Sequence, residues 1–147
     1  MATDLIEAVA GVLLADGALE LAFGRAGWCW RNLADPDQPL PVCVLTAVSN
    51  KIIDEPAATR GDRSRAEGRT FQVAVYATSP SSAAGLADAV VLAIQAASEA
   101  GTLPITRGLV VDIAETGTET DERDPDPGPN GETVWSRTIE LEAMISR

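Results

Sequence analysis

The strongest constraint on the fold of this chain is the run from Thr70 to Gly101, TFQVAVYATSPSSAAGLADAVVLAIQAASEAG. Its first residues alternate between two faces in β-branched and aromatic company, which predicts a strand. One face of that strand holds Phe71, Val73 and Val75, and the other holds Gln72, Ala74 and Tyr76. A strand with one fully apolar face requires a partner that covers this face.

The second half of the run predicts that partner, a helix with its start and stop signals in place. Ser79 is a suitable N-cap and Pro80 suits the first helical position. Gly101 suits the left-handed residue after the helix, and Pro104 prevents its continuation. An apolar stripe at three- and four-residue spacing faces one way and comprises Leu86, Ala89, Val90, Ala93, Ile94 and Ala97. Folding this stripe onto the strand starts a core, in which each fully buried Val, Leu, Ile or Phe contributes roughly 1.5–3 kcal/mol.

The N-terminal part predicts a first helix, capped by Thr3 or Asp4 and ended by Gly17. A short helical turn follows and stops at Gly24. Residues 28–31 are consistent with a short edge strand, in which two tryptophans flanking Cys29 are interpreted as core or interface filler. Prolines 36, 39 and 41 then indicate a loop.

Three further strands are expected. The segment 42–48 is apolar on both faces, which indicates an interior place in the sheet or a covered second face. A strand is expected over 109–114. The segment 134–145 alternates most regularly, with Ile139, Leu141 and Ala143 on one face and polar residues on the other, as in an antiparallel strand with one wet face.

The expected order is helix, strand, strand, helix, strand, strand. This order predicts an α+β fold in which a four-stranded, largely antiparallel sheet of two long hairpins carries two helices on one face. At 147 residues the chain is expected to form a single domain. The hairpin tips, at about residues 49–69 and 115–133, are longer than usual. The prolines of the second tip are expected to keep it irregular.

Composition excludes several classes of function. The formal net charge is −11, from 11 Lys and Arg against 22 Asp and Glu, which disfavours gripping nucleic acid or an anionic membrane. An acidic surface has three possible explanations: it keeps the protein soluble, it reflects a halophilic or generally acidic proteome, or it repels a polyanion that passes nearby. A membrane span is not expected, since no run of about 20 apolar residues is apparent. A signal peptide is not expected either, and the sequence is interpreted as cytosolic or assembled in the cytosol.

Catalytic chemistry is also disfavoured. The chain has no histidine, so the usual general base and the commonest zinc ligand are missing. Its two cysteines, Cys29 and Cys43, are interpreted as buried free thiols, with a single disulfide as the alternative. The acidic run 115–126 lacks the spacing of an EF-hand loop. We therefore expect no enzyme, no metal site and no cofactor.

What remains is an interaction protein whose two hairpin tips carry opposite charge. We interpret these tips as candidate subunit interfaces, a basic one with Arg60, Arg63, Arg65 and Arg69 and an acidic one with Asp121, Glu122, Asp124 and Asp126. If the basic tip of one copy met the acidic tip of the next, the contact would be head-to-tail, and such contacts close into rings when the rotation permits. The alternative is that both tips are disordered in the isolated protein.

The order of parts resembles the tail terminator, or tail completion, proteins of long-tailed bacteriophages and gene transfer agents. The segments that carry the resemblance are LIEAVAGVLLADGALELAFG, LPVCVLTAV and FQVAVYATSPSSAAGLADAVVLAIQAA. The resemblance implies a virion protein that forms a ring, typically hexameric, and caps the tail tube at its head-proximal end. The implied partners are further copies of this chain, the tail tube protein and the head-side connector or stopper, and DNA would pass through the lumen without specific binding.

Two other readings of the sequence stay open. One is a head-completion or minor tail protein of the neck of the particle. The other, from a different class, is a monomeric ferredoxin-like binding module for a small ligand or peptide. The long acidic, proline-rich second tip and the Trp28-Cys29-Trp30 cluster both depart from the tail terminator pattern.

Overall fold

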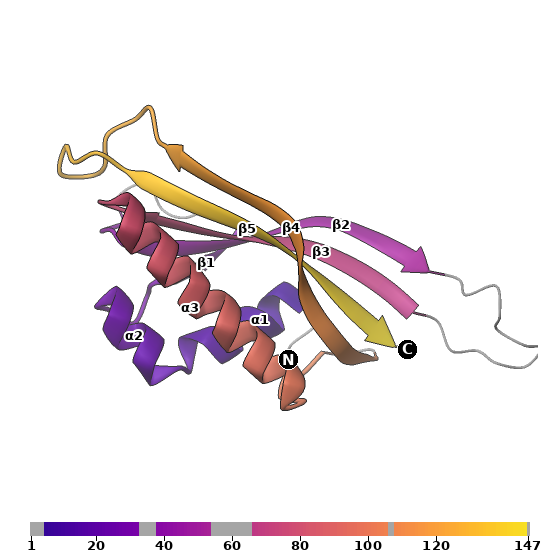
Figure 1. The fold of residues 1–147 in the computed structure, drawn as a ribbon. Helices are drawn as coiled ribbons and strands as arrows, with labels where there is room; N and C mark the ends of the chain where they lie inside the picture. Colours follow the sequence, from indigo (N-terminus) through magenta and orange to yellow (C-terminus); the bar gives the residue numbers. More distant parts are fainter. Residues whose placement is uncertain (1–4, 33–37, 54–65, 106–107, 147) are drawn as a thin grey trace, which may run out of the picture.

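The protein is a twisted sheet with all of its helices on one face (Figure 1). This computed structural model describes residues 5–32, 38–53, 66–105 and 108–146. The elements in chain order are α1 (Leu5–Leu14), α2 (Gly17–Phe23), β1 (Cys29–Arg31), β2 (Val42–Ile53), β3 (Ala66–Ala77), α3 (Pro80–Glu99), β4 (Leu109–Arg123) and β5 (Trp135–Ser146).

The α+β class is confirmed, but the predicted numbers of strands and helices were wrong. Among the described residues the sheet has five strands, in the order β1-β2-β3-β5-β4, and three helices cover it. The strand beyond the predicted four is β1, at the place where residues 28–31 were consistent with a short edge strand. It pairs in parallel with β2, whereas the other neighbours are antiparallel. The extra helix is α2: Gly17 begins it instead of ending α1, because the Asp16 carboxylate accepts hydrogen bonds from the backbone N–H groups of Ala18 and Leu19.

The strand-to-helix run folds as its residues predict. Phe71, Val73 and Val75 are buried beneath the helices. The Ser79 hydroxyl caps α3 by accepting the backbone N–H of Ser82 at 3.1 Å. Gly101 adopts a left-handed φ of 69°, which a residue with a Cβ adopts only with strain. The start and end of α3 are therefore set locally, by residues next to each end.

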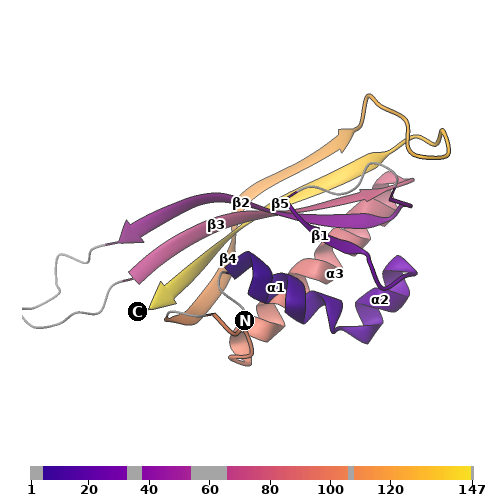
Figure 2. The ribbon, with the colours of Figure 1, turned by 180° about the vertical axis from the view of Figure 1, so that it is seen from behind.

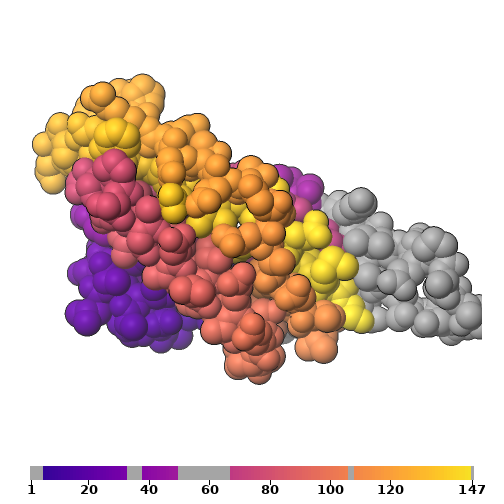
Figure 3. Space-filling view, in the orientation of Figure 1, coloured from indigo at the N-terminus to yellow at the C-terminus, as the bar shows by residue number. Residues whose placement is uncertain are grey.

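The buried stripe of α3 differs slightly from the predicted one. Val90, Ile94 and Ala97 are buried as expected, while Leu86, Ala89 and Ala93 pack partly buried at the edge of the core. The fully inward positions also include Ala83, Ala87 and Val91. The helix lies across β3, β4 and β5, between the N-terminal helices and β4 (Figures 1 and 3). This placement closes the core over the centre of the sheet.

Helix α3 bears on the expectation that the chain has no membrane span. It is the one helix of the described residues that is long and apolar enough to cross a membrane, with a mean hydropathy of 1.3. Length and composition alone make this weak evidence, because the core helix of a soluble protein passes the same test. Here Val90 and Ile94 are buried against the sheet, so packing accounts for the apolar character of the helix.

Both predicted hairpin tips were too long. On the first hairpin, β2 and β3 stay paired as far as Ile53 and Ala66, so its strands take up much of the 49–69 range. On the second, β4 continues to Arg123 because it keeps pairing with β5 through two irregularities, one of them around Gly117. Gly117 has a φ of 92°, which suits glycine. The prolines restrict the backbone only beyond β4, from Pro125 on.

The N-terminal segment around the tryptophans packs largely into the core. Trp28 is fully buried and stacks on Phe23, with ring centroids 4.3 Å apart. Cys29 and Cys43 lie opposite each other on β1 and β2 as buried free thiols, which confirms that interpretation. The pKa of the Cys43 thiol is raised, mainly by its hydrogen bond with Cys29 and secondly by burial. Trp30 is only partly buried, and it pairs in register with Val44, on the face of the sheet away from the two cysteines.

Candidate interaction groove on the open sheet face

The face of the sheet opposite the helices carries aligned rows of side chains. At one end of the sheet the register sets Val42, Tyr76, Ser136 and Glu122 side by side on β2, β3, β5 and β4. The next row holds Val44, Ala74, Thr138 and Thr120. Because alternate residues of a strand point to the same face, these two rows form one continuous surface. Figure 2 shows the sheet and the helices after a rotation of 180° about the vertical axis from the view of Figure 1.

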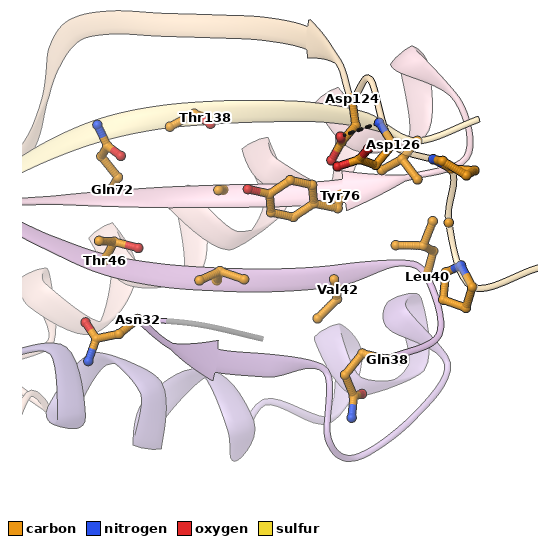
Figure 4. Close-up of a pocket in the computed structure, with 16 residues that line it drawn as sticks. Asn32, Gln38, Leu40, Val42, Thr46, Gln72, Tyr76, Asp124, Asp126 and Thr138 are labelled. Carbon is orange, nitrogen blue, oxygen red and sulfur yellow. Dashed lines mark hydrogen bonds between the residues drawn. The ribbon is translucent and has the colours of Figure 1, made fainter. Parts of the chain in front are cut away.

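Two loops partly cover this surface and hollow it into a groove of about 400 Å³. One loop includes Leu40 and precedes β2, and the other joins β4 to β5 (Figure 4). Val42 and Val44 of β2, and Val134 at the end of the second loop, are only 4%, 8% and 6% exposed. The apolar second face of the 42–48 segment thus matches the prediction of a covered face, although only at this end.

The loop between β4 and β5 is held by its own hydrogen bonds. The Asp124 carboxylate accepts the backbone N–H of Asp126 at 3.0 Å (Figure 4), and the Asp124 N–H donates to the carbonyl of Val134 at 2.9 Å. The Glu132 carboxylate accepts the backbone N–H of Asn130 at 2.9 Å. These contacts place Asp124 and Asp126 at the lining of the groove.

Tyr76 lies at the centre of this end of the groove, with its ring beside the acidic loop (Figure 4). Burial, and after it the negative charges of Asp124 and Glu122, raise the pKa of the Tyr76 hydroxyl above its ordinary value. The raised pKa keeps the hydroxyl neutral at physiological pH. The groove thus combines apolar residues and one aromatic ring with neutral polar side chains such as Gln72 and Thr138, and it is acidic at the end near Asp124.

The structure separates the four acidic candidates onto two faces. Asp121 lies on the helix side of β4 and forms a bidentate pair with Arg137 of β5, at 2.7 and 3.0 Å. Arg137 also lies 3.0 Å from Glu119 and 3.7 Å from Asp88 of α3. This pairing lowers the pKa of the Asp121 carboxyl, with the Arg137 hydrogen bond as the main cause. Asp121 therefore already has a cation within its own chain.

Glu122, Asp124 and Asp126 differ from Asp121 in this respect. They lie on or beside the open face, and within the described residues none of the three has a salt bridge to a lysine or arginine. From Asp124 to Val134 the sequence itself contains no basic residue. This end of the groove therefore carries negative charge that no salt bridge within the described residues neutralises.

Of the basic candidates, only Arg69 falls within the described residues. It belongs to β3, and its Nε donates to Glu67 Oε1 at 2.8 Å, with the Glu67 side chain largely buried. Arg60, Arg63 and Arg65 lie outside the described residues. The interface prediction for all eight residues stays a prediction, because a single chain does not test a contact between copies.

The sequence did not predict the groove, although it did predict the strand face that forms its floor. The alternation of 71–76 places Gln72, Ala74 and Tyr76 on the outer face, but nothing local indicates that two distant loops fold over them.

The described residues hold no group of three or more cysteine or acidic side chains arranged to bind a metal. The expectation that the protein has no metal or cofactor stays a prediction.

Comparison with solved structures shows a likeness in fold. No protein-family model matches the chain, and no curated protein matches it. The fold is similar to that of a chain in a solved structure described as the virion of a native gene transfer agent particle, with a TM-score of 0.60. The match covers 97% of this chain and 95% of that one, at 18% sequence identity. At this identity the likeness concerns the fold alone, which it supports over nearly the whole length of both chains.

Proposed function

We propose that this chain is a structural virion protein that forms a ring at the head-proximal end of a phage-type tail tube. The ring is expected to be hexameric, as is typical of the family that the sequence resembles. The ring ends growth of the tube and joins it to the head-side connector or stopper. The observation that carries the proposal is the near full-length fold likeness to a chain of a gene transfer agent virion. The sequence resemblance to tail terminator proteins supports the finer assignment.

The edges of the sheet suit repeated contacts between copies. β1 pairs with only Cys43, Val44 and Leu45 of β2, so the rest of β2, as far as Ile53, has no strand beside it on that edge among the described residues. At the other edge β4 exposes Leu109 and Val111, each 60% accessible. Open strand edges and exposed apolar side chains favour association with another chain. A closed ring would cover such edges and leave none for further addition of tube subunits.

The chemistry of the chain fits a role in shape and contact. We propose that the protein is not an enzyme and acts without a cofactor, in the virion, after assembly in the cytoplasm of the bacterial host. A net charge of −11 disfavours adhesion of DNA phosphates, so DNA in the lumen would pass without specific binding. Ring contacts between copies, and surfaces for the tube and connector, are then the only recognition tasks required.

The proposal is tested by imaging particles that have been assembled in the absence of this protein. We expect tails of irregular length that are not joined to heads, and negative-stain images of the purified chain, alone or on tail tubes, should show rings of one subunit number. Tails of normal length that fail only to attach to heads would instead favour a head-completion protein. A strict monomer, both alone and with tail tubes, would contradict the ring and favour a binding module.

A further inference from the structure

We propose that the β4 edge of one copy pairs with the free part of the β2 edge of a second copy, so that the sheet continues from chain to chain. This inference rests on the proposed ring and names the strands that would join its subunits. The two strands lie near opposite edges of one sheet, whose order is β1-β2-β3-β5-β4. Each copy therefore offers one edge of each kind.

The free part of the β2 edge begins where β1 ends. The Cys43 N–H and the Leu45 carbonyl both form hydrogen bonds with the segment around β1, at 2.8 and 2.7 Å. Alternate residues of a strand direct their backbone polar groups to the same edge, so Ala47 is the next residue on this side. β1 pairs with no residue of β2 beyond Leu45. From Ala47 to Ile53, β2 therefore has no strand beside it on this edge among the described residues.

The β4 edge is free along its whole length in the part of the chain that the structure describes. β4 pairs with β5 alone, on its other side. Proteins guard edge strands against pairing with charged side chains and proline. Neither is present at the start of β4, Leu109–Val111, or at the start of the free part of β2, residues 47–50. Both edges therefore hold an unguarded stretch.

These stretches expose apolar side chains at the same end of the sheet. Val48 on β2 is 48% exposed, and Leu109 and Val111 on β4 are each 60% exposed. Val48 and Val111 both lie at register irregularities, where an extra residue is left out of the regular pairing. The register places Ile52 of β2 and Val110 of β4 in one row across the sheet (Figure 1). A small stagger between copies, which closing a sheet requires, would bring the two stretches together.

The strand directions also suit this contact. β2 and β5 run the same way, since both are antiparallel to β3, and β4 runs opposite to β5. β4 is therefore antiparallel to β2. A neighbour that continues the sheet with its helices on the same side keeps this relation, so β4 and the β2 of the next copy form an antiparallel pair, the slightly more stable kind.

A contact between unlike edges repeats from copy to copy. Each copy then has one neighbour on either side, and the series closes into a ring when the rotation permits. Pairing of β4 with the β4 of another copy would instead leave both β2 edges open. Only the contact between β4 and β2 covers both edges of every copy.

Lysine substitution on each edge tests the contact in the full chain. Val48→Lys places a charge on the β2 edge and Val111→Lys on the β4 edge, and both side chains are exposed, so the single chain should keep its fold. Each variant alone should associate at least about tenfold more weakly than the unchanged protein in sedimentation equilibrium, because pairing would bury the new charge. Circular dichroism and urea unfolding check that both variants fold.

The matched control is Leu92→Lys, which changes the net charge by the same amount. Leu92 is 66% exposed and belongs to the helix layer, not to a strand edge. This control should associate like the unchanged protein. Edge variants that associate as strongly as the control would overturn the inference. If they also form rings, the proposed function stands while the edge contact fails.

A mixture of the two edge variants tests the head-to-tail arrangement. Val48→Lys keeps an intact β4 edge and Val111→Lys keeps an intact β2 edge, so two unlike chains can form one sound contact. We expect dimers that do not grow further, at concentrations at which each variant alone is monomeric. Dimers of Val48→Lys alone would show that β4 pairs with itself and would overturn the inference. A mixture that stays monomeric at millimolar concentration would overturn it as well.

The behaviour of the unchanged protein separates this inference from the proposed function. Open chains or dimers that both edge substitutions disrupt would support the edge contact and contradict the ring. A protein that stays monomeric, both alone and with tail tubes, would contradict the two together.

Discussion

Two residues of α3 provide the sharpest test of how the helix is oriented. Ile94 is 1% exposed and packs in the core, whereas Leu92, two positions earlier, is 66% exposed. Replacing either by alanine removes side-chain carbons and improves helix propensity. The two substitutions are therefore matched in chemistry and differ in burial.

The expected magnitudes follow from that difference. Ile94→Ala loses the transfer free energy of the buried carbons and leaves a cavity under the helix, which costs about 3 kcal/mol of unfolding free energy, within the ~2–5 kcal/mol range for such changes. For a domain of this size the midpoint of thermal unfolding should fall by roughly 10 °C. Leu92→Ala exposes no new core surface, so its effect should stay within about 0.5 kcal/mol.

Urea unfolding followed by circular dichroism measures both variants. The denaturant midpoint should fall for Ile94→Ala with an unchanged slope, which identifies a loss of stability rather than a change in the unfolded state. Two protein concentrations separate folding from self-association. Equal destabilisation by the two substitutions, or a larger effect of Leu92→Ala, would refute this orientation of α3 and with it the burial of the core.

Three further predictions concern a cap, an ion pair and the thiols. Ser79→Ala should lower the unfolding free energy by about 1 kcal/mol through loss of the α3 cap, and Ser79→Asp, which keeps an acceptor, should restore most of it in the same urea assay. Asp121→Asn should destabilise by less than about 1 kcal/mol, because the carboxylate is mostly exposed, and less still at high salt. Pairing with Arg137 lowers the pKa of Asp121 in the folded state. The stability that the ion pair contributes is therefore complete above the unfolded pKa of 3.8 and is lost as the pH falls through the folded pKa. In a pH series of unfolding curves, the unchanged protein and Asp121→Asn should differ in stability above the folded pKa and converge below it. Cys29 and Cys43 should resist a disulfide reagent in the native protein and react fully in denaturant, since both are buried and the pKa of Cys43 is raised; rapid native reaction would contradict their burial.

The local features of this protein could be predicted from its sequence. The caps of α3, the inward face of β3 and the single wet face of β5 each depend on residues within one element, or on its immediate neighbours. Ser79, Pro80 and Gly101 act over one turn of helix, and strand alternation has a period of two residues. Because each helix and strand could be recognised locally, their order along the chain predicted the α+β class.

Other features depended on contacts between distant parts of the chain. The sequence was consistent with a short strand at 28–31, but its parallel pairing with β2 depends on the tertiary structure. Strand β4 extends to Arg123 because β5 pairs with it. Asp121 and Glu122 are adjacent in sequence, yet the pleat of β4 points one toward Arg137 and the other toward Tyr76. The groove exists because loops from two remote segments meet over the same end of the sheet. Such pairings are set by the closing of the sheet as a whole, and no local pattern of residues encodes them.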